Sequence, residues 1–117
     1  MIWIAMILPA VVCLGILIWL WRSKPLVFRA IYVNDVPDSL QKQVIYIAGE
    51  TGHFWSVSML CPCGCGDMIQ LNLLQQVRPC WQVQTHPDQM ISITPSVWRQ
   101  QGCKSHFWIR HGRIDWY

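Results

Sequence analysis

Three cysteines alternate with proline and glycine in the stretch Leu60-Cys61-Pro62-Cys63-Gly64-Cys65-Gly66-Asp67. Glycine and proline weaken the helix or strand that they interrupt, so such a run needs a compensating interaction. Thiolates that converge on a metal ion supply one, and zinc favours four ligands in a tetrahedron. A fourth cysteine, Cys103, lies far along the chain. We therefore predict that the two stretches meet in space and hold zinc through Cys61, Cys63, Cys65 and Cys103.

The spacing of the cysteines leaves a second ligand set open. Zinc knuckles commonly use a C-x-x-C spacing, whereas only one residue separates each clustered pair here. Alternate residues of an extended strand share one face, and Pro62 and the glycines could bend the chain so that the sulfurs converge. The alternative set combines Cys103 and His106, which have the C-x-x-H spacing, with two of the clustered cysteines. Cys80 is predicted to be a core residue.

The length and charge of the chain limit the classes of function. The chain has 117 residues and a net charge of +3, which is enough for one domain but not for two. Lysine and arginine are spread thinly, without a basic run or stripe. Nucleic-acid binding therefore has no support in the sequence.

The amino-terminal segment is apolar. Residues 2–21 carry no charge, and Arg22 and Lys24 follow at once. About twenty apolar residues in a helix span a bilayer, and the positive-inside rule then places the following domain in the cytoplasm. We predict a transmembrane anchor at residues 1–24, a cysteine-rich domain at residues 25–117, and a single-pass protein of the cell inner membrane. A cleaved signal peptide is the alternative, but a basic start and a small-x-small cleavage site are missing.

The rest of the chain has the alternating pattern of β-strands. β-branched and aromatic residues alternate with polar ones between turn-forming residues. The predicted fold is mainly β: a small antiparallel, zinc-stapled domain behind the anchor. Strands are predicted at residues 26–33, 43–48, 53–60, 68–73, 80–85, 89–94, 105–110 and 113–116, with one helical turn in residues 95–102.

Ser105 and His106 are the candidate catalytic residues. A serine hydrolase needs a serine whose proton a nearby histidine can accept. Adjacent residues of a strand point to opposite faces, so this pair requires further partners. Ser105 could meet His53, His106 could meet Ser96, and Asp67 could orient either histidine. Two other interpretations stay open: His106 is a metal ligand or a packed side chain, or one of the cysteines is a nucleophile.

The motif order resembles that of a small bacterial family, domain-of-unknown-function 6527. The resemblance covers roughly residues 26–117 and excludes the anchor. It rests on Cys61-Pro62-Cys63-Gly64-Cys65-Gly66-Asp67, Leu71-Asn72-Leu73, Arg78-Pro79, Trp81, Pro95-Ser96, Gly102-Cys103-Lys104-Ser105-His106-Phe107-Trp108-Ile109, Gly112-Arg113 and Trp116. Members tend to be encoded beside bacterial ubiquitin-like proteins and their E1-like and E2-like enzymes.

The resemblance implies an accessory role in such a conjugation pathway. The implied activity is that of a peptidase that trims or removes the ubiquitin-like protein, with Ser105 and His106 as the functional pair and the four cysteines as the zinc site. The partners would be the ubiquitin-like protein or its E1-like and E2-like enzymes. The alternative is a non-catalytic, zinc-stabilised module that docks a conjugation enzyme or substrate at the membrane. A thiol-transfer protein is a third reading.

Overall fold

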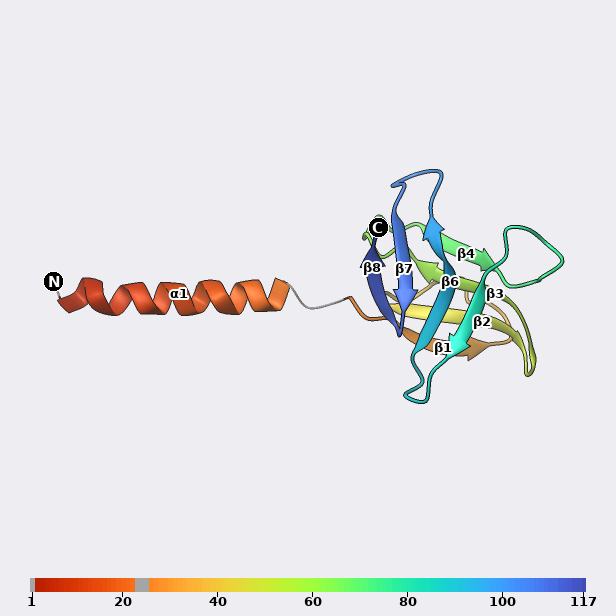
Figure 1. The fold of residues 1–117 in the computed structure, drawn as a ribbon, viewed down its shortest axis with the longest axis horizontal. Helices are drawn as coiled ribbons and strands as arrows, with labels where there is room; N and C mark the ends of the chain where they lie inside the picture. The colour runs from red at the N-terminus through yellow and green to blue at the C-terminus, as the bar shows by residue number, and fades with distance from the viewer. Residues whose placement is uncertain (1, 23–25) are drawn as a thin grey trace.

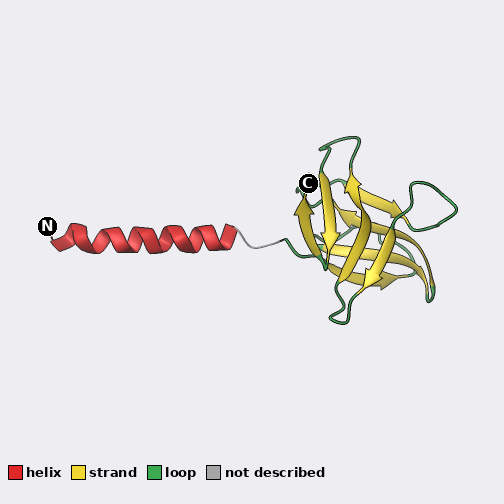
Figure 2. Ribbon diagram, in the orientation of Figure 1, coloured by secondary structure: helices red, strands yellow, loops and turns green. Residues whose placement is uncertain are grey.

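The computed structural model describes residues 2–22 and 26–117. This part of the chain contains one helix, α1 (Ile2–Arg22), and eight strands. Figure 2 shows the helix outside the region of the strands. The strands are β1 (Arg29–Val33), β2 (Val44–Glu50), β3 (His53–Leu60), β4 (Met68–Asn72), β5 (Gln82–Thr85), β6 (Ile91–Trp98), β7 (His106–Arg110) and β8 (Arg113–Trp116).

The strands form two four-stranded sheets, one from each half of the domain. The first has the order β1-β2-β3-β4 and the second the order β5-β6-β7-β8. Every neighbouring pair is antiparallel except β1 and β2, which are parallel. The strands of the two sheets cross at a steep angle (Figure 1). This mainly-β architecture agrees with the prediction, although the parallel pair means that the domain is not purely antiparallel.

Apolar side chains from both sheets form one core. Strand alternation turns every second side chain inward, and β-branched residues suit this position. Their burial is the main stabilising term of the domain, because each fully buried aliphatic or aromatic side chain contributes about 1.5–3 kcal/mol. Side chains with 1% exposure or less include Ile45, Ile47, Val57 and Met59 in the first sheet, and Ile91, Ile93, Phe107 and Ile109 in the second.

The segment before β1 joins the two sheets. Phe28 N–H donates to Gly112 O at 2.7 Å, and Ile114 N–H donates to Leu26 O at 3.0 Å. Between these bonds, Val27 forms an isolated bridge with Arg113 of β8. The chain therefore runs along the β8 edge of the second sheet before it enters the first.

Gly112 offers a test of this junction. Its φ is +75°, and an added Cβ would overlap Met90 Cε and lie 2.9 Å from Phe28 O. We expect Gly112→Ala to lower the free energy of unfolding by about 2–4 kcal/mol, because both the backbone conformation and the close approach disfavour a side chain. Urea denaturation measures the loss.

The matched control for this substitution is Gly52→Ala. Gly52 also has a positive φ, of +83°, but an added Cβ would meet nothing within 4 Å. Only the backbone conformation opposes alanine there, so the expected loss is about 1 kcal/mol. Equal losses in the two variants would show that the close packing around Gly112 does not stabilise the domain.

The structure corrects the prediction for residues 95–102. Strand β6 continues through Pro95 and Ser96 to Trp98, where the sequence predicted a helical turn. Proline has no N–H for the ladder and is tolerated in strands mainly at edges and bulges. The register of β6 shifts between Ile93 and Val97, which is where Pro95 lies. The proline therefore marks a bulge rather than the end of the strand.

The structure also overturns the predicted membrane anchor. Within the residues that it describes, no helix combines the length and the apolar character required to cross a membrane. The predicted transmembrane helix at residues 1–24 and the predicted single-pass location in the inner membrane are therefore wrong. The predicted boundary between residues 24 and 25 lies outside the described residues.

Candidate active site and metal centre

Four sulfur atoms gather where the β3–β4 connection meets the β6–β7 loop. The Sγ atoms of Cys61, Cys63, Cys65 and Cys103 all lie within 4.8 Å of one another. Cys61 N–H donates to Asp67 O at 2.9 Å, which closes the β3–β4 connection around the cysteines. The structure therefore brings together the four cysteines that the sequence predicts as ligands, and Cys80 lies outside this cluster.

The spacing of the sulfurs suits a tetrahedral ion. Cys61 Sγ lies 3.3 Å from Cys63 Sγ and 3.6 Å from Cys103 Sγ. Sulfurs bound at about 2.3 Å around zinc are separated by about 3.8 Å, so small shifts would bring these atoms to ligand positions. Soft thiolate donors favour zinc or another thiophilic metal. The four cysteines can therefore hold a metal ion.

Arg99 lies against the sulfur cluster. Its Nη1 donates to Cys103 Sγ at 3.0 Å and to Cys65 Sγ at 3.4 Å, and its Nη2 donates to Asp67 Oδ2 at 3.1 Å. The bond to Asp67 raises the pKa of Arg99 above its ordinary value, so the guanidinium stays charged. Four thiolates around a divalent ion carry an excess of negative charge, and a guanidinium that donates to the sulfurs offsets part of it.

The thiols of the cluster differ in acidity. Burial raises the pKa of Cys61 to about 12. The hydrogen bond with Ser105 lowers the pKa of Cys103 to about 5. Metal binding requires thiolates, and of these two thiols Cys103 ionises more readily than Cys61.

His106 pairs with Ser96 in the structure. Ser96 Oγ lies 3.0 Å from His106 Nε2. His106 stands directly opposite Trp98 in the β6–β7 ladder, and Ser96 lies two residues before Trp98 on the same face. This contact is one of the alternatives that the sequence left open, and it is the arrangement that a serine nucleophile and its base require.

Ser105 belongs to the sulfur cluster. Its Oγ lies 3.1 Å from Cys103 Sγ and 3.8 Å from Cys61 Sγ. Because Ser105 and His106 are adjacent in sequence, their side chains leave the backbone on opposite sides. The structure therefore does not bring the two predicted catalytic side chains together, and the catalytic role of Ser105 stays a prediction.

A bulge in β6 positions Ser96. Ile93 pairs with Ile109 and Val97 pairs with Phe107, so four steps along β6 match two along β7. Bulges bend a strand and re-aim its side chains, and they are common beside active sites. The signal for this bulge in the sequence is the Pro95-Ser96 pair within an otherwise alternating stretch. From the sequence alone we interpreted this proline as the start of a helical turn and therefore did not predict the bulge.

Two aromatic rings hold the imidazole of His106. The ring of Tyr117 stacks on it with a centroid distance of 4.0 Å and an interplanar angle of 12°. The ring of Trp98 stacks at 5.1 Å and 8°. Tyr117 N–H also donates to His106 O at 2.9 Å, and this backbone bond holds Tyr117 beside His106. Among the described residues no carboxylate forms an ion pair with His106, and Asp67, a partner that the sequence offered, binds Arg99.

A second serine–histidine contact lies at the other end of β6, and the sequence did not predict it. Ser92 Oγ lies 2.7 Å from His86 Nε2. The same oxygen accepts the N–H of His111 at 2.9 Å, and the two imidazoles stack at 4.3 Å. Asp88 binds His111, and this bond lowers the pKa of Asp88. These contacts connect the β5–β6 turn to the β7–β8 turn. We therefore interpret this group of side chains as stabilising the two turns.

The chain matches one family model. Residues 32–117 match the family described as bacterial ubiquitination-like system serine protease (BubE). No curated protein and no solved structure matches the chain. The predicted link to a bacterial ubiquitin-like pathway is thereby confirmed, whereas the family name inferred from the motifs stays a prediction.

Proposed function

The chain belongs to the bacterial ubiquitination-like system serine protease (BubE) family, and on this basis we propose that it is a serine hydrolase that trims or removes a ubiquitin-like protein. Ser96 is the nucleophile and His106 is the general base. The observation that carries this proposal is the distance of 3.0 Å between Ser96 Oγ and His106 Nε2. The pair lies on a sheet face that a protein substrate can reach, since Trp98 and Tyr117 beside it are 61% and 84% exposed.

The reaction follows from these two groups. Ser96 Oγ attacks the carbonyl carbon at the end of the ubiquitin-like tail, while its proton passes to His106 Nε2. The tetrahedral intermediate then collapses, the bond to the leaving amine or alcohol breaks, and that group takes the proton from His106. Water attacks the acyl-serine with His106 again as base. The products are the free carboxylate of the tail and the regenerated Ser96.

We propose that the sulfur cluster holds zinc and has a structural role. A zinc ion bound by all four cysteines would have no open position for substrate. Cys103 precedes His106 by three residues, so a metal ion would tie the β6–β7 loop to the β3–β4 connection. This tie would hold the start of β7, and with it His106, in register with β6.

Labelling with a fluorophosphonate, which reacts with activated serines, tests the proposal. We expect the full-length protein to be labelled at Ser96 and His106→Ala to lose the label, because the hydroxyl needs its base. Ser92→Ala is the matched control and should keep the label, since Ser92 contacts a different histidine. Peptide mapping by mass spectrometry identifies the modified residue.

The same experiment separates the alternatives. A label on Ser105 would restore the pairing predicted from the sequence and overturn the role of Ser96. A folded protein without any label, which binds a ubiquitin-like protein but does not cleave it, would be the docking module instead.

The aromatic stack should matter for turnover. In the absence of a contacting carboxylate, the rings of Trp98 and Tyr117 keep the imidazole in its reactive orientation, and orientation contributes strongly to rate. We expect Tyr117→Ala to lower kcat about tenfold with little change in KM. Tyr117→Phe retains the ring and should retain kcat. A loss of kcat in both variants would assign the effect to the phenol hydroxyl and not to stacking.

A further inference from the structure

The backbone carbonyl of Ser96 accepts a hydrogen bond from a tryptophan side chain outside β6. The pairing of β5 with β6 ends where Gln82 stands opposite Thr94, and Ser96 lies two residues further along β6. At this point Trp81 Nε1 donates to Ser96 O at 3.4 Å. The backbone of the proposed nucleophile is therefore connected to the end of the β4–β5 loop.

One asparagine organises this loop, which comprises residues 73–81. Asn72 Oδ1 accepts the N–H of Leu74 at 3.0 Å, and Asn72 O accepts the N–H of Trp81 at 2.9 Å. Asn72 Nδ2 donates at 3.0–3.1 Å to three carbonyls of the loop, those of Leu74, Val77 and Pro79. A single side chain thus binds the inside of the loop, and the backbone of the same residue closes the loop at Trp81.

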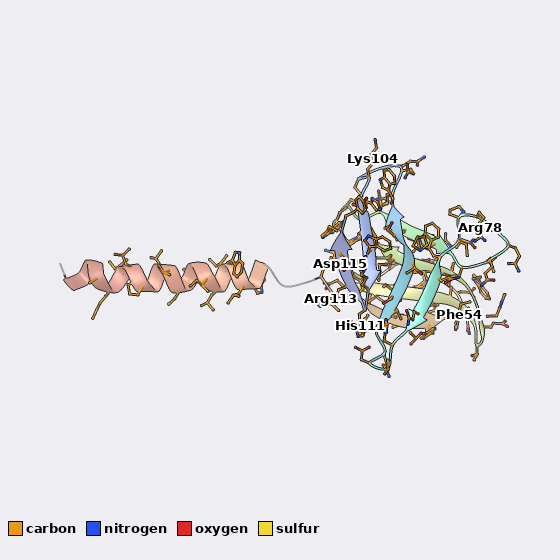
Figure 3. The ribbon with its side chains drawn as sticks, viewed as in Figure 1. Phe54, Arg78, Lys104, His111, Arg113 and Asp115 are labelled. Carbon is orange, nitrogen blue, oxygen red and sulfur yellow. The ribbon has the colours of Figure 1, made fainter. Side chains whose placement is uncertain are left out.

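The loop lies outside the core, so these hydrogen bonds determine its shape. Residues 75–79 are exposed, and Figure 3 shows Arg78 on the part of the loop that projects from the sheets. Trp81 packs against the core, but it also lines a cleft of about 500 Å³. An indole with open space beside it can shift unless its backbone is fixed. The bonds of Asn72 provide that restraint.

We propose that Asn72 and Trp81 are positioning residues for the proposed hydrolysis. Asn72 shapes the loop, the loop places the indole of Trp81, and the indole holds the carbonyl of Ser96 so that its Oγ faces His106. The bulge disrupts the regular ladder in this part of β6, which leaves the orientation of Ser96 dependent on such a contact. The inference deepens the proposed function and rests on it for the role of Ser96.

The rate of fluorophosphonate labelling at Ser96 of the full-length protein tests the inference. In the first variant 3-benzothienylalanine replaces Trp81, which keeps the shape of the indole but has sulfur in place of the N–H. We expect the labelling rate constant to fall about tenfold, because the hydroxyl is less well aligned with its base. On a ubiquitin-like precursor kcat should fall by a similar factor with KM unchanged.

The matched control is the same replacement at Trp55. Trp55 is also half-buried, and it lies in β3 of the other sheet. This variant should keep the labelling rate and kcat of the unmodified protein, because its indole is not bonded to Ser96. Urea denaturation verifies that each variant is folded under the assay conditions.

Asn72→Asp tests the path from the loop to Ser96. Aspartate keeps the acceptor for Leu74 N–H but loses the three donor bonds and repels the loop carbonyls. We expect a loss of labelling rate of about tenfold, and little further loss when the replacement at Trp81 is added, since the two residues act through one contact. Losses that multiply would show that Asn72 acts independently of Trp81.

The outcomes separate the inference from the proposed function. An unchanged labelling rate and kcat in the Trp81 variant, with Ser96 of the unmodified protein labelled, would overturn the inference and leave the hydrolase standing. Equal losses in the Trp81 and Trp55 variants would also overturn it, because the effect would then not depend on the bond to Ser96. A folded unmodified protein without a label at Ser96 would overturn both.

Discussion

Replacing Ser96 with alanine is expected to lower hydrolysis of a ubiquitin-like precursor by at least about 10³-fold, with the fold unchanged. The hydroxyl supplies the bond-forming atom, and water cannot take its place in a covalent pathway. His106→Ala should lose a similar amount, because the two groups act as one unit. The double variant should be no worse than either single one. Steady-state kinetics on a precursor with extra residues after its terminal glycine, monitored by mass spectrometry, gives these values.

The second serine–histidine contact provides the matched control for this pair. Ser92→Ala and His86→Ala remove the same atoms at the other end of the sheet. Both should keep kcat within about threefold of the unmodified protein, although they should be less stable by about 1 kcal/mol from the lost hydrogen bonds. A loss of activity confined to Ser92→Ala and His86→Ala would move the active site to that cluster.

Removing one ligand of the sulfur cluster should have the largest effect on stability. We expect the full-length protein, purified under reducing conditions without added zinc, to contain one zinc per chain and Cys103→Ser to contain less. Structural zinc binds with about 10–16 kcal/mol in small domains, so the variant should lose several kcal/mol of folding free energy. Elemental analysis and urea denaturation measure the two quantities. Activity should fall with zinc content, because without the metal the β6–β7 loop before His106 is no longer connected to the β3–β4 connection.

Cys80→Ser is the control for Cys103→Ser. Cys80 is partly buried and lies outside the sulfur cluster, and its Sγ donates to Trp81 O at 3.6 Å. We expect this variant to keep its metal and most of its stability. A folded wild-type protein without metal would remove the zinc proposal, and the cluster would then act as reactive thiols. In that case Cys103, with its lowered pKa, should be alkylated before Cys61.

Much of the sheet structure could be read from alternation. The clean alternation of residues 68–73 predicted a strand close to the observed β4, and the strands predicted at residues 53–60 and 113–116 match β3 and β8. The error at residues 95–102 arose because a proline in a sequence usually indicates the end of a strand. Only the pairing of β6 with β7 shows that the strand continues across a bulge there. Because of the same error, the predicted strand ended at residue 94 and did not include Ser96, which lies in β6 beside His106.

The four cysteines were readable from the sequence, because thiols at alternate positions with a fourth at a distance have few other uses. The sequence could name Ser96 only as one alternative partner of His106, since the pairing depends on register. A shift of one residue in a strand moves every side chain to the opposite face. The sequence by itself determined the mainly-β character, the set of thiols and the link to a bacterial ubiquitin-like pathway. The tertiary structure decided that His106 faces Ser96 and that Ser105 faces the sulfurs, because strand pairing and one bulge set which side chains share a face.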